Sequence, residues 1–194
     1  MTRLTPIALV VVAASLAAQD GSDLKTNIDR LSAFDYAART NAARAIRRVP
    51  VTEAVPGLVE AIRNHQDSFV RYRALILLTA FNDPKTTDLM RGLVRDPNDR
   101  VREVACRWFE LHPDPPIVPA LVAALNTEQA EFVRPALIRA LAASAGDPQV
   151  QRALLSEAGR GFDFFRAAVI EALGDYRAAF AAATLAEIAK LDGP

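Results

Sequence analysis

The chain has one cysteine and two histidines among its 194 residues, and its 23 basic and 23 acidic side chains leave no net charge. A single cysteine excludes a disulfide framework within the chain, and two histidines exclude a histidine-rich metal site. The charge balance argues against nucleic-acid binding, which normally depends on a concentrated basic surplus. Aromatic residues are also few, at 7% of the chain.

Alanine is abundant instead, at 37 residues, and hydrophobic residues make up 51% of the chain against 24% charged residues. This balance is typical of a folded protein and excludes a disordered one. Alanine has the highest helix propensity and a low strand propensity. The composition therefore favours an all-α fold.

The N-terminus has the three parts of a secretory signal peptide. A positive charge at Arg3 precedes an uncharged apolar run over 4–16, and small residues follow up to Ala17 and Ala18. This order predicts a signal peptide over 1–18, cleaved after Ala17 or Ala18. An uncleaved membrane anchor is the alternative, although the run is shorter than the roughly 20 apolar residues that span a bilayer. We therefore expect an exported protein, periplasmic or extracellular, with no membrane span in the mature chain.

An arginine recurs along the rest of the chain at steps of 31 or 32 residues. An apolar residue stands one position before each arginine, and others stand four and seven positions after it. This spacing marks one face of an α-helix, so each copy of the repeat contains a helix with the same buried face. We call these residues the recurrent arginines: Arg39, Arg71, Arg102, Arg134 and Arg166.

A second helix precedes this one in each copy. Leucine or isoleucine recurs thirteen and nine positions before the arginine in three copies, as at Leu58 and Ile62, and a spacing of four marks one helical face. Each unit is therefore predicted to hold a helix A, a short turn and a helix B. The predicted repeat domain covers 19–194, with units at 24–50, 51–82, 83–113, 114–146 and 147–177 and a half unit at 178–194.

The start of helix B carries the most specific pattern. Asp67 to Ala74 has the sequence Asp-Ser-Phe-Val-Arg-Tyr-Arg-Ala, and Asp99 to Ala105 has Asp-Arg-Val-Arg-Glu-Val-Ala. Together with the period of about 32 residues, these segments resemble the HEAT repeat, in the short bacterial form related to phycobilisome-lyase repeats. The resemblance implies an α-solenoid of about five helix pairs plus a terminal helix, in which stacked pairs share one core.

The recurrent arginines have two interpretations. In the first, each arginine pairs with an acidic residue three or four positions earlier, or with its equivalent in the next unit, and holds the turn between the helices. In the second, the guanidinium groups form a cationic ladder for an extended acidic partner. We favour the structural interpretation, because every recurrent arginine has such an acid. The acids are Asp35, Asp67, Asp99, Glu131 and Asp163.

The position five residues after the recurrent arginine points away from the buried face of helix B. It holds arginine in three copies, at Arg44, Arg107 and Arg139, and Tyr72 and Arg73 lie nearby. Tyrosine and arginine are enriched at binding hot spots. We therefore predict a partner-binding surface at these five residues, with an ordinary solvated helix face as the alternative.

The sequence contains no catalytic constellation. Cys106 falls on the buried face of helix B, whereas a nucleophilic cysteine needs exposure. Motifs for phosphate, dinucleotide or serine-nucleophile chemistry are missing. We expect a non-catalytic protein-interaction module or assembly scaffold without a cofactor or metal, which binds an unidentified protein and self-associates through the half unit at its C-terminus. The alternative is a lyase- or chaperone-like protein acting on a pigment or cofactor attached to a partner, on family resemblance alone.

Overall fold

The structure, a computed structural model, describes residues 23–159 and 163–191. Every regular element in these two ranges is helical, so the predicted all-α class is confirmed. No helix within them combines the length and the apolarity needed to cross a membrane. The predicted signal peptide lies outside the described residues. Contacts within the chain divide it into two compact units, one ending at Thr86 and the other beginning at Thr87.

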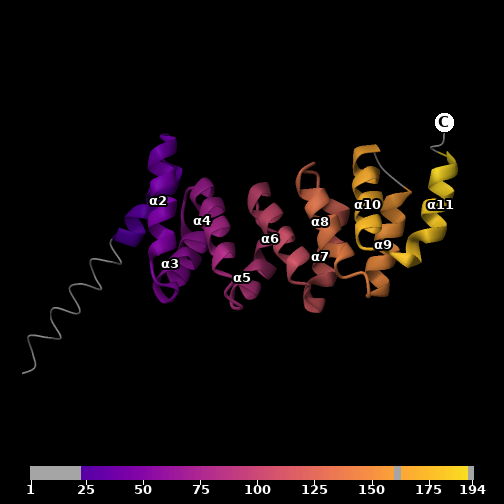
Figure 1. The fold of residues 1–194 in the computed structure, drawn as a ribbon, viewed down its shortest axis with the longest axis horizontal. Helices are drawn as coiled ribbons and strands as arrows, with labels where there is room; N and C mark the ends of the chain where they lie inside the picture. The colour runs from indigo at the N-terminus through magenta and orange to yellow at the C-terminus, as the bar shows by residue number, and fades with distance from the viewer. Residues whose placement is uncertain (1–22, 160–162, 192–194) are drawn as a thin grey trace, which may run out of the picture. The chain divides into compact units, whose positions relative to one another are not determined.

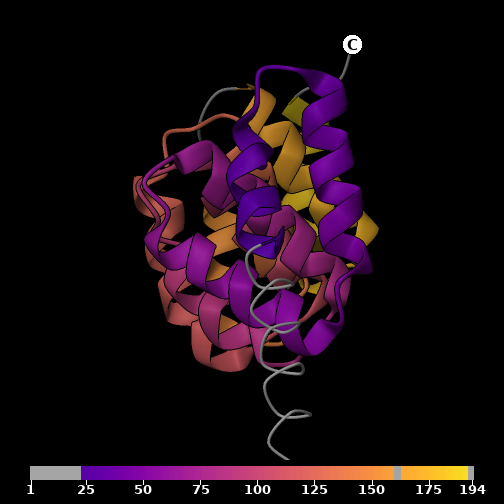
Figure 2. The same ribbon diagram turned by 90° about the vertical axis from the view of Figure 1, so that its left-hand side faces the viewer.

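The first unit holds two helix pairs, each a helix A followed by a helix B. Its elements are a helix over 23–29 that continues into the 3₁₀ turn η1 (Arg30–Ser32), then α2 (Tyr36–Arg48), α3 (Val51–Asn64) and α4 (Ser68–Phe81). α3 packs along α4, and η1 contacts both α2 and α4. Figure 1 shows α3 and α4 as neighbours, and Figure 2 turns this unit toward the viewer, with the segment 23–32 beside α2.

The second unit holds three helix pairs and a terminal helix. Its elements are α5 (Thr86–Leu93), α6 (Asp99–Leu111), η2 (Pro115–Ile117), α7 (Val118–Thr127), α8 (Val133–Ala142), α9 (Pro148–Ala158), α10 (Asp163–Asp175), η3 (Ala179–Ala181) and α11 (Ala182–Leu191). The B helices α6, α8 and α10 pack on one another in chain order, and so do the A helices α7, α9 and α11 (Figure 1). Stacked helix pairs with a final helix that has no partner are thus the observed arrangement, as predicted.

Polar side chains fix where the B helices begin. The carboxylate of Asp35 accepts the backbone N–H three residues later at 2.7 Å, and that of Asp67 accepts the N–H two residues later at 2.8 Å. The third helix B is capped by Asn98, so Asp99 is its first helical residue, where a negative charge is favourable. Caps of this kind typically contribute about 1 kcal/mol each.

The helix-B face that the sequence marks as apolar forms the core of each pair. The residues seven positions after the recurrent arginines are at most 1% exposed: Ile46, Leu78, Phe109, Leu141 and Leu173. Full burial of such a side chain contributes about 1.5–3 kcal/mol relative to exposure. Ala74, Ala105 and Ala140 are inaccessible to solvent, and their small size lets neighbouring helices approach closely. The repeated spacing in the sequence therefore corresponds to a repeated core layer.

Candidate partner-binding site

Arg139, one of the residues predicted to bind a partner, is engaged within the stack of B helices. Its Nη1 lies 2.9 Å from Asp175 at the end of α10, and its Nε lies 2.7 Å from Glu110 of α6. Hydrogen bonds to Asp175 and Glu110 raise the pKa of the Arg139 guanidinium. The hydroxyl of Tyr176 donates to the same Glu110 at 3.3 Å. Arg139 thus links three successive B helices, and its predicted binding role stays a prediction.

Arg107 and Arg44 do face solvent. The side chain of Arg107 is 69% exposed, and its Nη2 lies 3.0 Å from Glu103 on the same helix. An exposed pair of this spacing contributes only about 0.3–0.5 kcal/mol. Arg44 is exposed on α2, and no ion pair within the described part of the chain includes it. These two arginines keep their charge available to a partner.

A row of large side chains lies on the outward face of α4. This face carries Phe69, Tyr72, Arg73 and Ile76. The spacings 69/72, 69/73, 72/76 and 73/76 are three or four residues, which places these side chains on one helix face. Phe69 is 41% exposed and Ile76 is 39% exposed. We call these four residues the α4 stripe. It contains two of the five residues predicted to bind a partner, Tyr72 and Arg73.

The side chains of the α4 stripe contact one another. The guanidinium carbon of Arg73 lies 4.6 Å from the centroid of the Phe69 ring, and the rings of Phe69 and Tyr72 are 6.3 Å apart. The Nε of Arg73 is buried and finds no hydrogen-bond partner among the residues that the structure describes. Neutral aromatic surface and an arginine with an unused donor are therefore held together on one helix, which carries no acidic residue.

The opposite face of α4 is equally apolar, and this explains why the stripe stands out. Val70, Leu75 and Leu78 on that face are inaccessible to solvent. A surface helix normally pairs an apolar inner face with a polar outer face, and a helix that is apolar all round is normally buried. Sequence reasoning missed Phe69, although the apolar residues on both faces of 68–81 were the signal that reveals it.

The recurrent arginines bind the turn between helix A and helix B. In each of four copies, Nη1 donates to the backbone carbonyl six residues earlier. The bonds run from Arg39 to Ala33 at 2.7 Å, Arg71 to His65 at 3.2 Å, Arg102 to Asp96 at 2.9 Å and Arg134 to Glu128 at 3.0 Å. For Arg166 the corresponding carbonyl belongs to residue 160, which is outside the described residues. The bond that these four arginines share is thus to a backbone carbonyl of their own turn.

The acidic partners of two recurrent arginines differ from those predicted. Arg102 pairs with Glu128 at 2.7 Å, where Asp99 or its equivalent in the next unit, Glu131, was expected. Arg134 pairs with a second glutamate, Glu157 of α9, at 2.9 Å. Each of these carboxylates belongs to helix A of the next pair or to its end, so the ion pairs join successive repeats. The other acids named from the sequence act differently or are not described: Asp67 is the cap of α4, and the side chain of Asp163 is outside the described residues.

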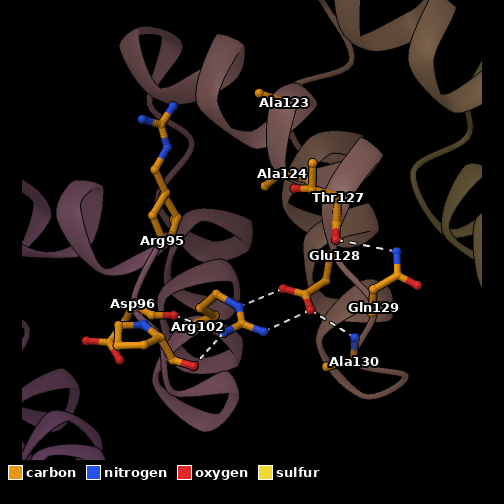
Figure 3. A pocket seen from close by; sticks show the side chains of 11 residues that line it. Arg95, Asp96, Arg102, Ala123, Ala124, Thr127, Glu128, Gln129 and Ala130 are labelled. Atoms are coloured by element: carbon orange, nitrogen blue, oxygen red, sulfur yellow. Dashed lines mark hydrogen bonds and ion pairs between the residues drawn. The ribbon is translucent and has the colours of Figure 1, made fainter.

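The Arg102–Glu128 pair lines a groove of about 810 Å³ beside the A–B turns of the second unit (Figure 3). Nε and Nη2 of Arg102 donate to the two carboxylate oxygens at 2.7 and 2.9 Å, and the N–H of Ala130 donates to Glu128 at 2.9 Å. Burial would raise the pKa of Glu128, but the hydrogen bonds from Arg102 and the backbone bring it below its ordinary value. The Glu128 carboxylate thus has its hydrogen bonds from Arg102 and the backbone. Arg95 points away from the pair (Figure 3).

The reactive side chains of the chain sit in structural positions. Cys106 is 2% exposed, and burial raises the pKa of its thiol to about 12, so it is not a nucleophile at neutral pH. The ring of His112 stacks on Trp108 at 3.8 Å, and the Nε2 of His65 lies 3.3 Å from Asp29. Across residues 23–159 and 163–191, no three side chains of the types that bind metals are grouped to hold an ion.

Comparison with known proteins gives one positive result. The family model of HEAT repeats matches residues 24–108 and 87–174. These overlapping matches run through both compact units and cover most of the chain. A search of curated proteins finds no match.

Proposed function

Because the chain belongs to the HEAT-repeat family, we propose that it is a non-catalytic protein-interaction module or assembly scaffold that binds a protein through the α4 stripe. The observation that carries this proposal is the exposure of Phe69 and Ile76 on a helix whose other face is already fully buried. Aromatic residues and arginine are enriched in the small clusters that dominate binding energy. The stripe has this composition.

A protein partner can use both the apolar and the charged part of the stripe. Covering Phe69 and Ile76 removes apolar surface from water, which is favourable by about 25 cal/mol per Å². A carboxylate on the partner, placed beside the Arg73 guanidinium, adds a charge-assisted hydrogen bond. The rings and the guanidinium are already in contact, so little side-chain freedom is lost on binding.

The stripe is tested by capture of partners with a photo-crosslinking amino acid at position 76 of the mature chain, in extract from the source organism. Phe69→Ala or Arg73→Ala in the same chain is expected to reduce the crosslinked product at least about tenfold, because hot-spot truncation costs 2 kcal/mol or more. Val51→Ala is the matched control, since Val51 is apolar, 49% exposed and on another helix of the same unit. A product that resists both stripe substitutions contradicts the proposal.

We also propose that the protein is exported, on the strength of the signal-peptide pattern over 1–18. Chain isolated from cells should then begin at Ala18 or Gln19, as determined by N-terminal sequencing. Retention of residues 4–16 in the isolated protein would instead support the membrane-anchor alternative. Substitution of the small residues at Ala17 and Ala18 by bulky ones should block the cleavage and serves as the control.

A further inference from the structure

α10 is the last B helix that the structure describes, and one of its sides has no further B helix against it. The half unit that follows supplies only α11, which packs on α9 and η3. The position four residues after the recurrent arginine shows the effect. Cys106 is 2% exposed and Ile138 is 0% exposed there, whereas the equivalent Ile170 is partly exposed. Among the described residues, the side that a further B helix would cover is therefore less covered than the same side of α6 and α8.

The contact between α8 and α10 shows how successive B helices bind each other. Near their N-termini, the guanidinium of Arg134 lies 4.7 Å from the centroid of the Phe165 ring. Near their C-termini, Arg139 pairs with Asp175 at 2.9 Å. Arg139 stands five residues after its recurrent arginine, and Asp175 stands nine residues after the recurrent arginine of the following repeat. The contact between α8 and α10 thus has an aromatic end and an ion pair of five-to-nine spacing.

α10 offers an exposed aromatic ring near its N-terminus and, at the five-residue position, one half of such an ion pair. Phe164 near its N-terminus is 60% exposed. Glu171, which stands at the five-residue position, is exposed, and no ion pair to it occurs among the residues that the structure describes. An aromatic ring and a carboxylate are therefore available at the two ends of the helix.

α2, the first helix B, offers an aromatic ring near its N-terminus and the complementary half of the ion pair. Tyr36 at its start is 74% exposed, and Arg48 at the nine-residue position is exposed without an ion pair in the described chain. α2 contains four arginines and no acidic residue. The charge of residues 23–194 is divided in the same way, with a basic excess in the first unit and an acidic excess in the second. Residues 23–86 hold 10 basic and 7 acidic side chains, and residues 87–194 hold 12 basic and 15 acidic ones.

We propose that α2 of one copy of the chain packs against the less covered side of α10 of a second copy, as the next B helix. In the register of α8 and α10, Arg48 pairs with Glu171 at the five-to-nine spacing that Arg139 and Asp175 show, and Tyr36 and Phe164 both stand at the N-terminal end of the contact. The contact joins two different surfaces of the chain, so a pair of copies still has one free α2 and one free α10. Further copies can therefore add in the same way. It uses no residue of the α4 stripe, so it goes beyond the proposed function.

Charge reversal tests this contact in the mature chain, 19–194, by sedimentation velocity over a range of concentrations at low ionic strength. The wild type is expected to associate as concentration rises. Glu171→Arg and Arg48→Glu should each weaken association at least about tenfold, because like charges then meet at the contact. An equimolar mixture of the two variants should associate again, since each variant supplies the charge that the other lacks.

The control is Arg152→Glu, which reverses an exposed arginine of α9 that forms no ion pair within the described residues. It changes the net charge as Arg48→Glu does, and it should leave association unchanged. Circular dichroism establishes that each variant is folded. A wild type that stays monomeric at every concentration, or a mixture that fails to associate, overturns the proposal. Ile76→Ala should leave association intact, so failure here is distinct from failure of the α4 stripe.

Discussion

Replacing Arg102 with methionine is expected to lower the free energy of unfolding by about 3–5 kcal/mol. The substitution removes both charged hydrogen bonds to Glu128, whose side chain is only 6% exposed, and leaves that carboxylate buried without a cation. It also removes the bond from Arg102 to the carbonyl of Asp96. Urea unfolding at neutral pH, followed by circular dichroism, measures the effect.

Two further variants separate the buried charge from the loss of packing. Arg95→Met removes an exposed arginine from the same groove and should change stability by less than about 0.5 kcal/mol. The double variant Arg102→Met with Glu128→Leu should recover part of the loss, because no unpaired buried carboxylate then remains. Equal effects of Arg102→Met and Arg95→Met would contradict the structural role of the pair.

The pH dependence of this effect has a defined sign. The pKa of Glu128 in the folded wild type lies below its ordinary value, so its stabilising contribution is complete above about pH 4.3 and is lost as pH falls through the folded pKa. Without Arg102 the main remaining influence is burial, which raises the pKa of Glu128. The variant then regains relative stability as pH falls. The difference between wild type and variant should therefore shrink between neutral pH and about pH 3.

Arg139→Met should lower the free energy of unfolding by about 1–2 kcal/mol, measured in the same way. The estimate is smaller than for Arg102, because the Arg139 side chain is 36% exposed and water screens its ion pairs. The loss affects contacts of α8 with both α6 and α10, since Glu110 and Asp175 lose their shared cation.

Arg107→Met is the matched control for Arg139, because both arginines stand five residues after a recurrent arginine. Arg107 has only the exposed contact to Glu103 on its own helix, so its replacement should cost less than about 0.5 kcal/mol. A loss as large as that of Arg139→Met would mean that the position itself, and not the bridging of helices, determines the effect.

The fold was predictable because its signal is repeated. A single amphipathic helix is a weak pattern, but the same apolar spacing around five arginines specifies the helix pairs and their common core face. The residues seven positions after those arginines are buried in every pair. Periodicity therefore determined which face of helix B is inside.

The candidate site was less predictable, because the partners of its arginines are far away in the sequence and a local pattern of residues does not reveal them. Sequence spacing suggested an acid three or four positions before Arg102, or its equivalent in the next unit, whereas its carboxylate partner is 26 positions away, just after the next helix A. Arg139 has the spacing of a solvent-facing residue, yet its partners are 29 and 36 positions away. Only the stacking of repeats brings these groups together. Phe69 was missed for a different reason, since the surface was predicted from the position five residues after the recurrent arginine and its neighbours, and Phe69 stands two residues before that arginine.

Arg102 and Arg134 each make two kinds of bond, one to the turn of their own repeat and one to the following repeat. A duplicated segment of 32 residues therefore carries the arginine–carbonyl bond of its own turn, together with the arginine that pairs with a glutamate of the next repeat. Adding or removing a whole number of such segments preserves both bonds, whereas an insertion between an arginine and the carbonyl six residues earlier separates the two. One whole repeat is thus the smallest unit that can be added to or removed from such a chain while both kinds of bond are kept.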